Sequence, residues 1–303
     1  MGEFTVVSFF TGMFWAMVYW VVAIFQFFVP PPRKDVSGKI VLITGAGSGI
    51  GQKLSIEFAK LGCSVVGWDI STDGLSKTGS LMSDERMTSQ WHPYKCDITD
   101  RHRVYEVAEK VQEDVGCVDI LINNAGIVTG KKFLDCRDEM IIKTMEVNTI
   151  AHFWTLKAFL PGMIDRDSGH VVTVASGAGL FGMPGQCDYA ASKFAAVGLT
   201  EALYCELEYS KSTGVKTTVV CPYYIDTGMF KGVETPLLPM IKSDDAVNQI
   251  VDAVLRNKTM LLMPRIVYFL YYLKGLMPAK TAFLTGNASG TMASMDTFRG
   301  RVD

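Results

Sequence analysis

The 26 residues from 4 to 29 carry no charged side chain, and this run limits the possible folds more than any other feature of the sequence. Ten of the 33 aromatic residues lie within it, and as an α-helix it would extend about 39 Å, beyond the roughly 30 Å hydrocarbon core of a bilayer. Such a helix crosses a membrane or lies hooked in one leaflet. A core helix is seldom apolar on every face, and a cleavable signal peptide fits less well because Glu3 is the only charge before the run. We therefore predict that residues 1–35 form a retained membrane anchor and linker.

The residues after this run indicate the side of the membrane on which the rest of the chain lies. Pro30, Pro31 and Pro32 end the helix, and Arg33 and Lys34 follow at once. Positive charge on this flank favours a cytosolic location for the remainder. The seven cysteines agree, because they lie at least 16 residues apart, as expected of reduced thiols.

Composition argues against several classes of protein. The 29 basic side chains against 31 acidic ones give a formal net charge of −2, which does not suit a polybasic nucleic-acid binder. There is no C-x-x-C, and none of the four histidines stands three or four residues from another. We therefore expect neither a nucleic-acid partner nor a metal site.

Apolar runs typical of strands alternate with amphipathic helical stretches after the anchor, and helices are expected to begin near residues 50, 101, 138, 188 and 243. This alternation predicts an α/β fold over residues 36–260, a Rossmann-type doubly wound parallel sheet with helices on both faces. Two apolar stretches, 227–242 and 260–273, are candidates for a substrate lid or a membrane-facing rim, and residues 261–303 are assigned to an apolar C-terminal extension. The six predicted strands are Lys39–Thr44, Ser64–Asp69, Trp91–Cys96, Ile120–Asn123, His170–Ala175 and Lys216–Cys221.

The first predicted strand runs directly into a glycine-rich turn. Its residues fit the pattern T-G-x-x-x-G-x-G, whereas the G-x-G-x-x-G and P-loop patterns fail. Glycines here let the backbone turn tightly and bring the N–H groups of a helix terminus against a pyrophosphate. A plain structural turn is the alternative, because glycine-rich turns between strand and helix recur in many folds. The residues of the turn that we assign to a dinucleotide are Thr44, Gly45, Ser48, Gly49, Ile50 and Gly51.

Asp69 closes the second predicted strand, 24 residues after Gly45. A carboxylate in this position accepts hydrogen bonds from both ribose hydroxyls of NAD and would repel the 2′-phosphate of NADP. Neither Ser48 nor Ile70 supplies a compensating positive charge. The sequence therefore favours NAD(H) over NADP(H), with a turn-capping role for Asp69 as the alternative.

Tyr189 and Lys193 stand one helical turn apart, so they share a face of the predicted helix. A phenol with a pKa near 10 is a poor base at neutral pH, and a neighbouring ammonium would lower that pKa. We therefore predict that Tyr189 exchanges the proton with the substrate and that Lys193 also holds a ribose. Ser176, after the fifth strand, would hydrogen-bond the reacting oxygen, and Asn148 would fix a water for proton relay.

Two other interpretations of these residues are weaker. A tyrosine and a lysine at this spacing are most often a solvated surface pair, but here they follow the other motifs in the order that one cofactor cleft requires. A serine hydrolase lacks support, because Val174 stands where the G-x-S-x-G elbow of Ser176 needs a glycine. Asn124, Ala125 and Gly126, after the fourth strand, add small residues at the carboxyl edge of the sheet, where such folds bind ligands.

In identity, order and spacing these motifs resemble the short-chain dehydrogenase/reductase superfamily over roughly residues 36–260. The resemblance implies that Asn148, Ser176, Tyr189 and Lys193 carry the reaction. It also implies an adenine contact from Asp97 and a nicotinamide-side segment containing Pro222 and Thr227. Tyr223 departs from the pattern, because a glycine commonly follows this proline, and the change would reshape the substrate side.

Residues 151–161 and 221–230, together with the anchor, resemble the membrane-bound branch of this superfamily, the retinol and 17-beta-hydroxysteroid dehydrogenases. The branch implies an apolar alcohol as substrate and a location at the endoplasmic reticulum or on lipid droplets, which together with the basic flank predicts a catalytic domain that faces the cytosol. The superfamily implies a homodimer that pairs through helices at 138–160 and 188–210.

We therefore predict a membrane-anchored oxidoreductase that uses NAD(H) to interconvert a lipophilic alcohol of retinoid or steroid type with its carbonyl. The apolar segment 229–241 suits such a substrate, although packing or membrane contact accounts for it nearly as well. A protein of the lipid-droplet or reticulum surface that binds NAD but acts mainly through its anchor and partners is the alternative.

Overall fold

The computed structural model describes residues 6–84 and 89–300, and it divides into two compact units after Asp35. In the first unit, α1 (Val6–Phe28) is one continuous helix that ends before the three prolines. By length and composition, residues 6–26 are apolar enough to cross a membrane, and none of this span is buried. The N-terminal apolar helix predicted from the sequence is therefore present.

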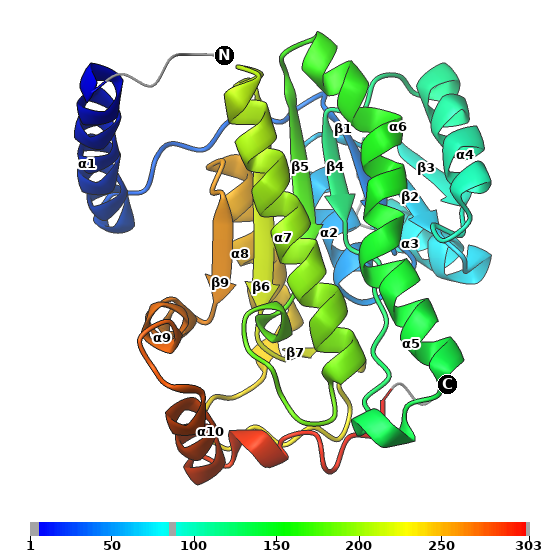
Figure 1. The fold of residues 1–303 in the computed structure, drawn as a ribbon. Helices are drawn as coiled ribbons and strands as arrows, with labels where there is room; N and C mark the ends of the chain where they lie inside the picture. The colour runs from blue at the N-terminus through cyan, green and yellow to red at the C-terminus, as the bar shows by residue number, and fades with distance from the viewer. Residues whose placement is uncertain (1–5, 85–88, 301–303) are drawn as a thin grey trace. The chain divides into compact units, whose positions relative to one another are not determined.

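In the second unit a seven-stranded parallel sheet has the order β3-β2-β1-β4-β5-β6-β9 (Figure 1). Most of these strands are buried on both faces, which explains why they appear in the sequence as continuous apolar runs rather than as alternating ones. The predicted doubly wound sheet is confirmed. Its strands are β1 (Ile40–Thr44), β2 (Ser64–Asp69), β3 (Trp91–Lys95), β4 (Ile120–Asn123), β5 (Gly169–Val174), β6 (Val215–Pro222) and β9 (Met260–Met263).

The seventh strand, β9, is a correction to the six predicted strands. Residues 260–263 pair in parallel with 219–222 of β6, so this part of the second apolar stretch belongs to the sheet and not to a lid or membrane-facing rim. The predicted start of the C-terminal extension, residue 261, falls inside this strand. A run of four apolar residues is too short to show the periodicity that separates a strand from other apolar segments.

Helices cover both faces of the sheet and enclose a separate apolar core on each. Leu54, Phe58 and Ile250 belong to the core under α2, α3 and α8, whereas Leu156 and Leu203 belong to the core under α4, α6 and α7. The sequence did not predict α3, which has only two large buried apolar residues. The helix bounds are α2 (Gly49–Lys60), α3 (Thr72–Asp84), α4 (Arg101–Asp114), α5 (Asp138–Met145), α6 (Ala151–Asp165), α7 (Cys187–Tyr209) and α8 (Ser243–Leu255).

The order of the strands places a crevice at the carboxyl edge of the sheet. From β1 the chain winds outward to β3 on one side and then returns to β4, beside β1, to wind outward on the other. The helices that follow β1 and β4 therefore diverge to opposite faces, and parallel sheets bind ligands at such a point.

Shorter elements extend the domain beyond this edge of the sheet. The segment between β6 and α8 contains the small parallel pair of β7 (Ile225–Asp226) and β8 (Ile241–Lys242). After β9 the chain forms α9 (Ile266–Lys274), α10 (Ala279–Ala288) and the 3₁₀ turn η4 (Thr291–Ala293). In Figure 1 these C-terminal elements lie at the end of the domain toward which the strands point.

Candidate active site

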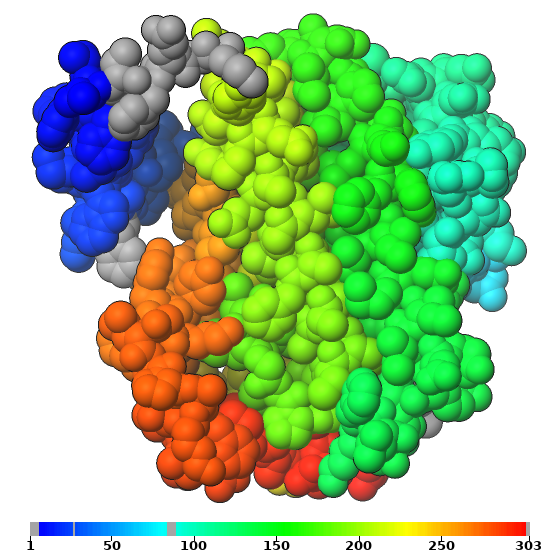
Figure 2. Space-filling model, viewed as in Figure 1, coloured from blue at the N-terminus to red at the C-terminus, as the bar shows by residue number. Residues whose placement is uncertain are grey.

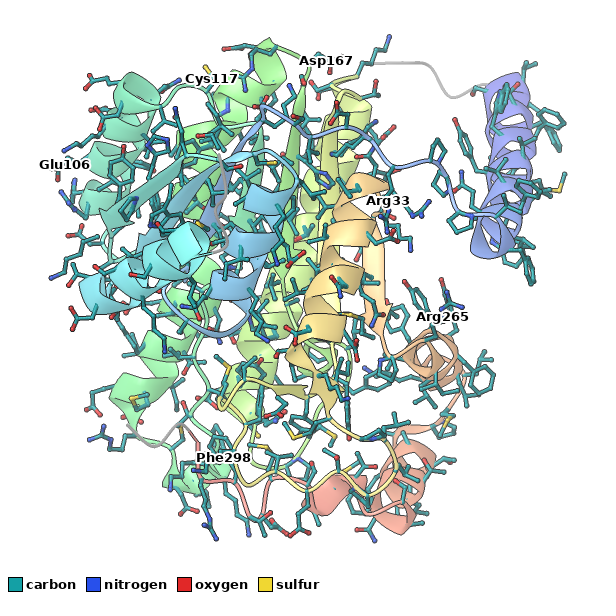
Figure 3. All side chains as sticks on the ribbon, turned by 180° about the vertical axis from the view of Figure 1, so that it is seen from behind. Arg33, Glu106, Cys117, Asp167, Arg265 and Phe298 are labelled. Atoms are coloured by element: carbon teal, nitrogen blue, oxygen red, sulfur yellow. The ribbon has the colours of Figure 1, made fainter. Side chains whose placement is uncertain are left out.

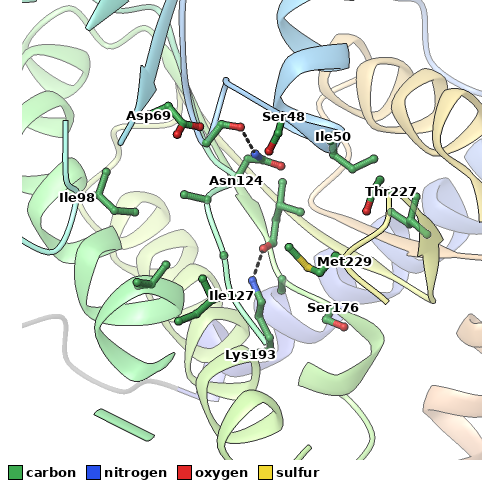
Figure 4. Close-up of a pocket in the computed structure, with 18 of the residues that line it drawn as sticks. Ser48, Ile50, Asp69, Ile98, Asn124, Ile127, Ser176, Lys193, Thr227 and Met229 are labelled. Carbon is green, nitrogen blue, oxygen red and sulfur yellow. Dashed lines mark hydrogen bonds between the residues drawn. The ribbon is translucent and has the colours of Figure 1, made fainter. Parts of the chain in front are cut away.

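A cavity of about 340 Å³ opens at the carboxyl edge of the sheet. Its walls come from the turns after β1, β2, β4, β5 and β6 and from α7 (Figure 4). Fourteen residues assigned from the sequence line it, namely Gly45, Ser48, Gly49, Ile50, Asp69, Asp97, Asn124, Ala125, Gly126, Ser176, Tyr189, Lys193, Pro222 and Thr227. Thr44, Gly51 and Asn148 do not line it and lie in the layer behind.

The glycine turn has a backbone that only glycine adopts without strain. Gly45 and Gly49 have φ values of +70° and +57°. Gly51 is required for another reason, because a Cβ there would lie 2.0 Å from the carbonyl oxygen of Gly45. The turn leads directly into α2, which begins at Gly49, so the positive end of the helix dipole faces the cavity.

Asp69 organises the turns beside it while lining the cavity. One carboxylate oxygen accepts the N–H of Gly47 at 2.9 Å and the other accepts the N–H of Ser71 at 2.9 Å. Asp97 lines the same end of the cavity, and hydrogen bonds from Thr99 together with the charge of Lys143 lower its pKa despite the opposing effect of burial. Two carboxylates thus stand at this end, where an adenosine ribose would lie.

Thr44 and Asn124 join the first and fourth strands beneath the cavity. The hydroxyl of Thr44, 1% exposed, accepts the N–H groups of Asn124 and Ala125 at 3.0 and 3.1 Å. The side-chain amide of Asn124 donates in return to the carbonyl of Thr44 at 2.9 Å. These bonds fix the distance between the two turns that form the floor of the site.

Tyr189 and Lys193 share the inner face of α7, and both are almost fully buried. The Lys193 ammonium lies 5.8 Å from the centre of the Tyr189 ring and donates a hydrogen bond to the carbonyl of Val174 at 2.9 Å. Ser176 lies two residues after the end of β5 and accepts the N–H of Ala178 through its hydroxyl. Figure 4 shows Ser176 and Lys193 at the end of the cavity away from Asp69.

Burial dominates the ionisation of this pair. It lowers the pKa of Lys193 to about 8. It raises the pKa of Tyr189 to about 12, and the hydrogen bond with Ser176 opposes this increase only in part. The sequence led us to expect a lowered pKa for this phenol. In the protein without ligands, desolvation outweighs the stabilisation of the phenolate.

Asn148 lies in a π-helical turn, η2 (Glu146–Ile150), between α5 and α6. Its side chain is fully buried, accepts the N–H of Ile127 at 2.9 Å and donates to the carbonyl of Ile127 and the hydroxyl of Ser192. It therefore ties the turn after β4 to α7. Such π-helical insertions are frequent at functional sites.

Several residues that line the cavity were not assigned to the site individually from the sequence. Lys143 comes from α5, and Tyr223, Met229 and Phe230 come from the segment after β6. The Phe230 ring lies 6.0 Å from the Tyr189 ring. The sequence shows only the apolar character of this segment, which does not reveal which side chains face inward.

Residues 294–299 pack against the segment after β6, on the side of the cavity that Phe230 lines. Phe298 contacts Phe230 with 6.4 Å between ring centres, and the Tyr224 hydroxyl shares a hydrogen bond with Ser294. The backbone of residues 231–234 bonds to that of residues 294–299. Figure 3 shows Phe298 at the same end of the domain as this segment. The predicted apolar C-terminal extension thus contributes to the support of the active site.

The residues fit a nicotinamide dinucleotide. The cavity carries carboxylates at one end, a glycine turn with a helix N-terminus in its wall, and a lysine, a tyrosine and a serine at the other end. A Cβ at Gly47 would lie 2.9 Å from Asp69, so the turn is shaped for close approach of the backbone. Among the described residues no group of histidine, cysteine or carboxylate side chains is arranged to hold a metal ion.

Fold and site together define an oxidoreductase that moves a hydride between an alcohol carbon and a nicotinamide cofactor. Residues 39–237 match the model of the short chain dehydrogenase family, and the chain belongs to this family. It is a short-chain dehydrogenase/reductase that acts on CH–OH groups.

Two individual relatives and one solved structure are similar to most of the chain. The chain is 50% identical to human epidermal retinol dehydrogenase 2 over 273 residues, which cover 89% of this chain and 88% of the relative. It is 41% identical to human retinol dehydrogenase 10 over 301 residues, or 90% and 88% of the two chains. The fold is similar to that of a short-chain dehydrogenase/reductase from Burkholderia phymatum solved with NAD, with a TM-score of 0.71, 24% identity, and coverage of 79% and 93%.

Proposed function

We propose that this protein is a membrane-anchored dehydrogenase that oxidises a lipophilic alcohol of the retinoid class with NAD, or reduces the corresponding carbonyl. One observation carries the proposal: the phenol of Tyr189 lies in the same cavity as Asp69 and the glycine turn, beside an apolar wall of Tyr223, Met229 and Phe230. Both human relatives are retinol dehydrogenases, which supports retinoids rather than steroids as the first substrates to test.

Each proposed step uses a group on this cavity. The hydroxyls of Ser176 and Tyr189 hold the substrate oxygen, and Tyr189 accepts its proton during oxidation or donates one during reduction. A bound nicotinamide cofactor would supply the hydride chemistry at the substrate carbon that bears this oxygen. The ammonium of Lys193 would favour the phenolate form of Tyr189, and the positive charge of the oxidised cofactor would add to this effect.

Asp69 supports the choice of NAD. Its carboxylate lines the cavity, and the only lysines or arginines among the lining residues are Lys143 and Lys193. Lys143 donates to Thr99 and Lys193 to Val174, so each is already held by another group. A 2′-phosphate beside Asp69 would therefore meet an anion without a dedicated cation.

The exposed helix α1 supports membrane anchoring, and the Arg33 and Lys34 that follow it support a cytosolic location for the catalytic domain at the endoplasmic reticulum or a lipid droplet. Phe153 of α6 and Tyr204 of α7, each about 40% exposed, support a homodimer that pairs through these helices.

The test is a panel of retinoids, steroids and fatty alcohols with NAD and with NADP, followed through nicotinamide absorbance. We expect turnover of all-trans-retinol with NAD and none with the Tyr189→Phe variant. Turnover of steroids alone would replace the substrate class, whereas NAD binding without turnover of any lipid alcohol would favour the alternative of a surface protein that acts through its anchor and partners.

A further inference from the structure

A group of large apolar side chains on α9, α10 and the turn between them stands exposed on the surface of the catalytic domain. Figure 2 shows these C-terminal elements as one continuous area of the surface. The exposed fractions run from 40% for Leu270 to 83% for Leu276. We name this group the C-terminal apolar patch. Its members are Ile266, Phe269, Leu270, Tyr272, Leu276, Phe283 and Leu284.

Helix α9 is apolar on two opposite faces, and only one of them faces the protein. The inner face packs Val267, Tyr268 and Tyr271 against β9 and its neighbours, and the Tyr268 hydroxyl donates to the carbonyl of Met260. Ile266, Phe269 and Leu270 lie on the outer face, where a helix exposed to water would carry polar residues. Helix α10 has no buried residue at all.

The charged side chains in the chain segment that contains the patch have one sign. Residues 259–295 contain Arg265, Lys274 and Lys280 and no aspartate or glutamate, although the whole chain has more acidic than basic side chains. Apolar side chains bordered by basic ones are typical of a surface that contacts an anionic lipid bilayer. A second copy of this chain suits the patch less well, because two such surfaces would bring basic side chains together without acidic partners.

The length of the linker keeps the domain close to the membrane. Seven residues, 29–35, separate the end of α1 from Val36, and fully extended they span about 25 Å at most. If α1 lies in a bilayer, as the proposed function holds, Val36 therefore stays within about 25 Å of its surface. A tether of this length keeps the domain near the lipid surface, so a second contact between domain and lipid is within reach.

The patch is also connected to the active site. The ammonium of Lys274 donates to the carbonyl of Leu180, in the loop that begins at Ser176, and it lies 5.0 Å from the centre of the Phe194 ring of α7. We call the end of the cavity that holds Ser176, Tyr189 and Phe230 the substrate end. After α10, a Cβ on Gly290 would lie 3.0 Å from Pro236, so the chain here contacts the segment that lines the substrate end. The end of α9 and the turn after α10 therefore contact both sides of that end.

We propose that the C-terminal apolar patch is a second membrane contact, which lies in the interface of the bilayer that holds α1 and turns the substrate end of the cavity toward the lipid. The proposal rests on the membrane anchoring proposed above. A lipophilic alcohol then passes between the bilayer and the cavity without crossing water.

Photo-crosslinking in the full-length protein tests this contact independently of activity. p-Benzoylphenylalanine replaces Phe269, Leu276 or Leu284 in separate variants, each reconstituted in vesicles of phosphatidylcholine and phosphatidylserine. The control position is Tyr209, which is 91% exposed and is the last residue of the 23-residue α7, about 34 Å along that helix from its first turn.

We expect covalent lipid adducts at the three patch positions and none at position 209. Cross-links between two chains in place of lipid adducts would assign the patch to a dimer interface and overturn the proposal. Adducts at none of the patch positions, or equal adducts at all four positions, would also overturn it.

A kinetic test connects the contact to substrate delivery. In the double variant Phe269→Ser and Leu276→Ser, the KM for retinol supplied in vesicles should rise about fivefold with kcat unchanged, whereas the KM for retinol dispersed in detergent should not change. An equal KM in vesicles would overturn the role in delivery. A parent protein that fails to oxidise retinol would overturn the proposed function and leave the cross-linking result to decide the membrane contact.

Discussion

The two ends of the active-site cavity are built in different ways. The cofactor end consists of short turns that leave adjacent strands of one sheet, and backbone bonds such as those of Thr44 and Asp69 hold it. The substrate end consists of segments far apart in the sequence, 223–242 and 291–300, which contact each other through side chains such as Phe230 and Phe298. Because the substrate end lies outside the sheet, its residues can differ between proteins of one fold without a change in the sheet. The same fold can therefore bind one dinucleotide and act on different substrates.

The largest expected effect comes from removing the hydroxyl of Tyr189, which in the proposed reaction exchanges the proton with the substrate. Tyr189→Phe should lower kcat for retinol by about a hundredfold to ten-thousandfold, since general acid–base catalysis contributes this much. Steady-state kinetics measures the loss, and NAD binding by fluorescence titration should stay within about twofold. Tyr209→Phe, at the exposed end of the same helix, is the matched control. Full turnover by Tyr189→Phe would show that another group exchanges the proton.

The Asp69→Ala variant should affect only the cofactor end of the cavity. Because a charged acceptor for two ribose hydroxyls is lost, the preference for NAD over NADP should fall by at least about tenfold, with KM for retinol unchanged. The ratio of kcat/KM values for the two cofactors measures it. Asp73→Ala, at the start of α3, serves as the control. An unchanged ratio in a folded Asp69→Ala variant would remove this carboxylate from cofactor selection.

The Phe298→Ala variant should affect only the substrate end of the cavity. Phe230 loses the ring that supports it, so KM for retinol should rise about fivefold to tenfold while KM for NAD stays the same. The comparison with Tyr209→Ala separates this effect from the general loss of an aromatic side chain. An increase in both KM values would mean that the two ends are not independent.

The smallest expected effect concerns the stability of the ligand-free protein. Folding lowers the pKa of Lys193 from its ordinary 10.5 to about 8, so at neutral pH the buried charge opposes folding. Lys193→Met removes this penalty and the hydrogen bond to Val174, and the free energy of unfolding should rise by about 1 kcal/mol at pH 7. Urea unfolding measures the change.

The direction in which stability changes with pH follows from the same lowered pKa of Lys193. Between about pH 8 and pH 10.5 the unfolded chain binds the extra proton, so this lysine makes the parent protein more stable as pH rises. The advantage of Lys193→Met should therefore shrink over this range. A variant that is less stable than the parent at pH 7 would contradict the assigned penalty.

Local patterns in the sequence were sufficient for the N-terminal apolar helix and for much of the sheet. The absence of charge from residue 4 to 29 predicts an apolar helix, and strands buried on both faces appear as apolar runs. The fourteen assigned residues that line the cavity follow strands that end at the same edge or lie on the helix beside it. Local patterns did not predict α3 or β9, because a short or weakly apolar element gains its stability from the neighbours that it packs against.

Sequence by itself determined the turns at the proposed cofactor end, since glycine, proline and charge act on the backbone within a few residues of themselves. Only the tertiary structure decided three other features: the inward direction of Phe230, the support that it receives from Phe298, and the raised pKa of Tyr189. Each depends on which surfaces exclude water, and that is fixed by contacts between residues distant along the chain.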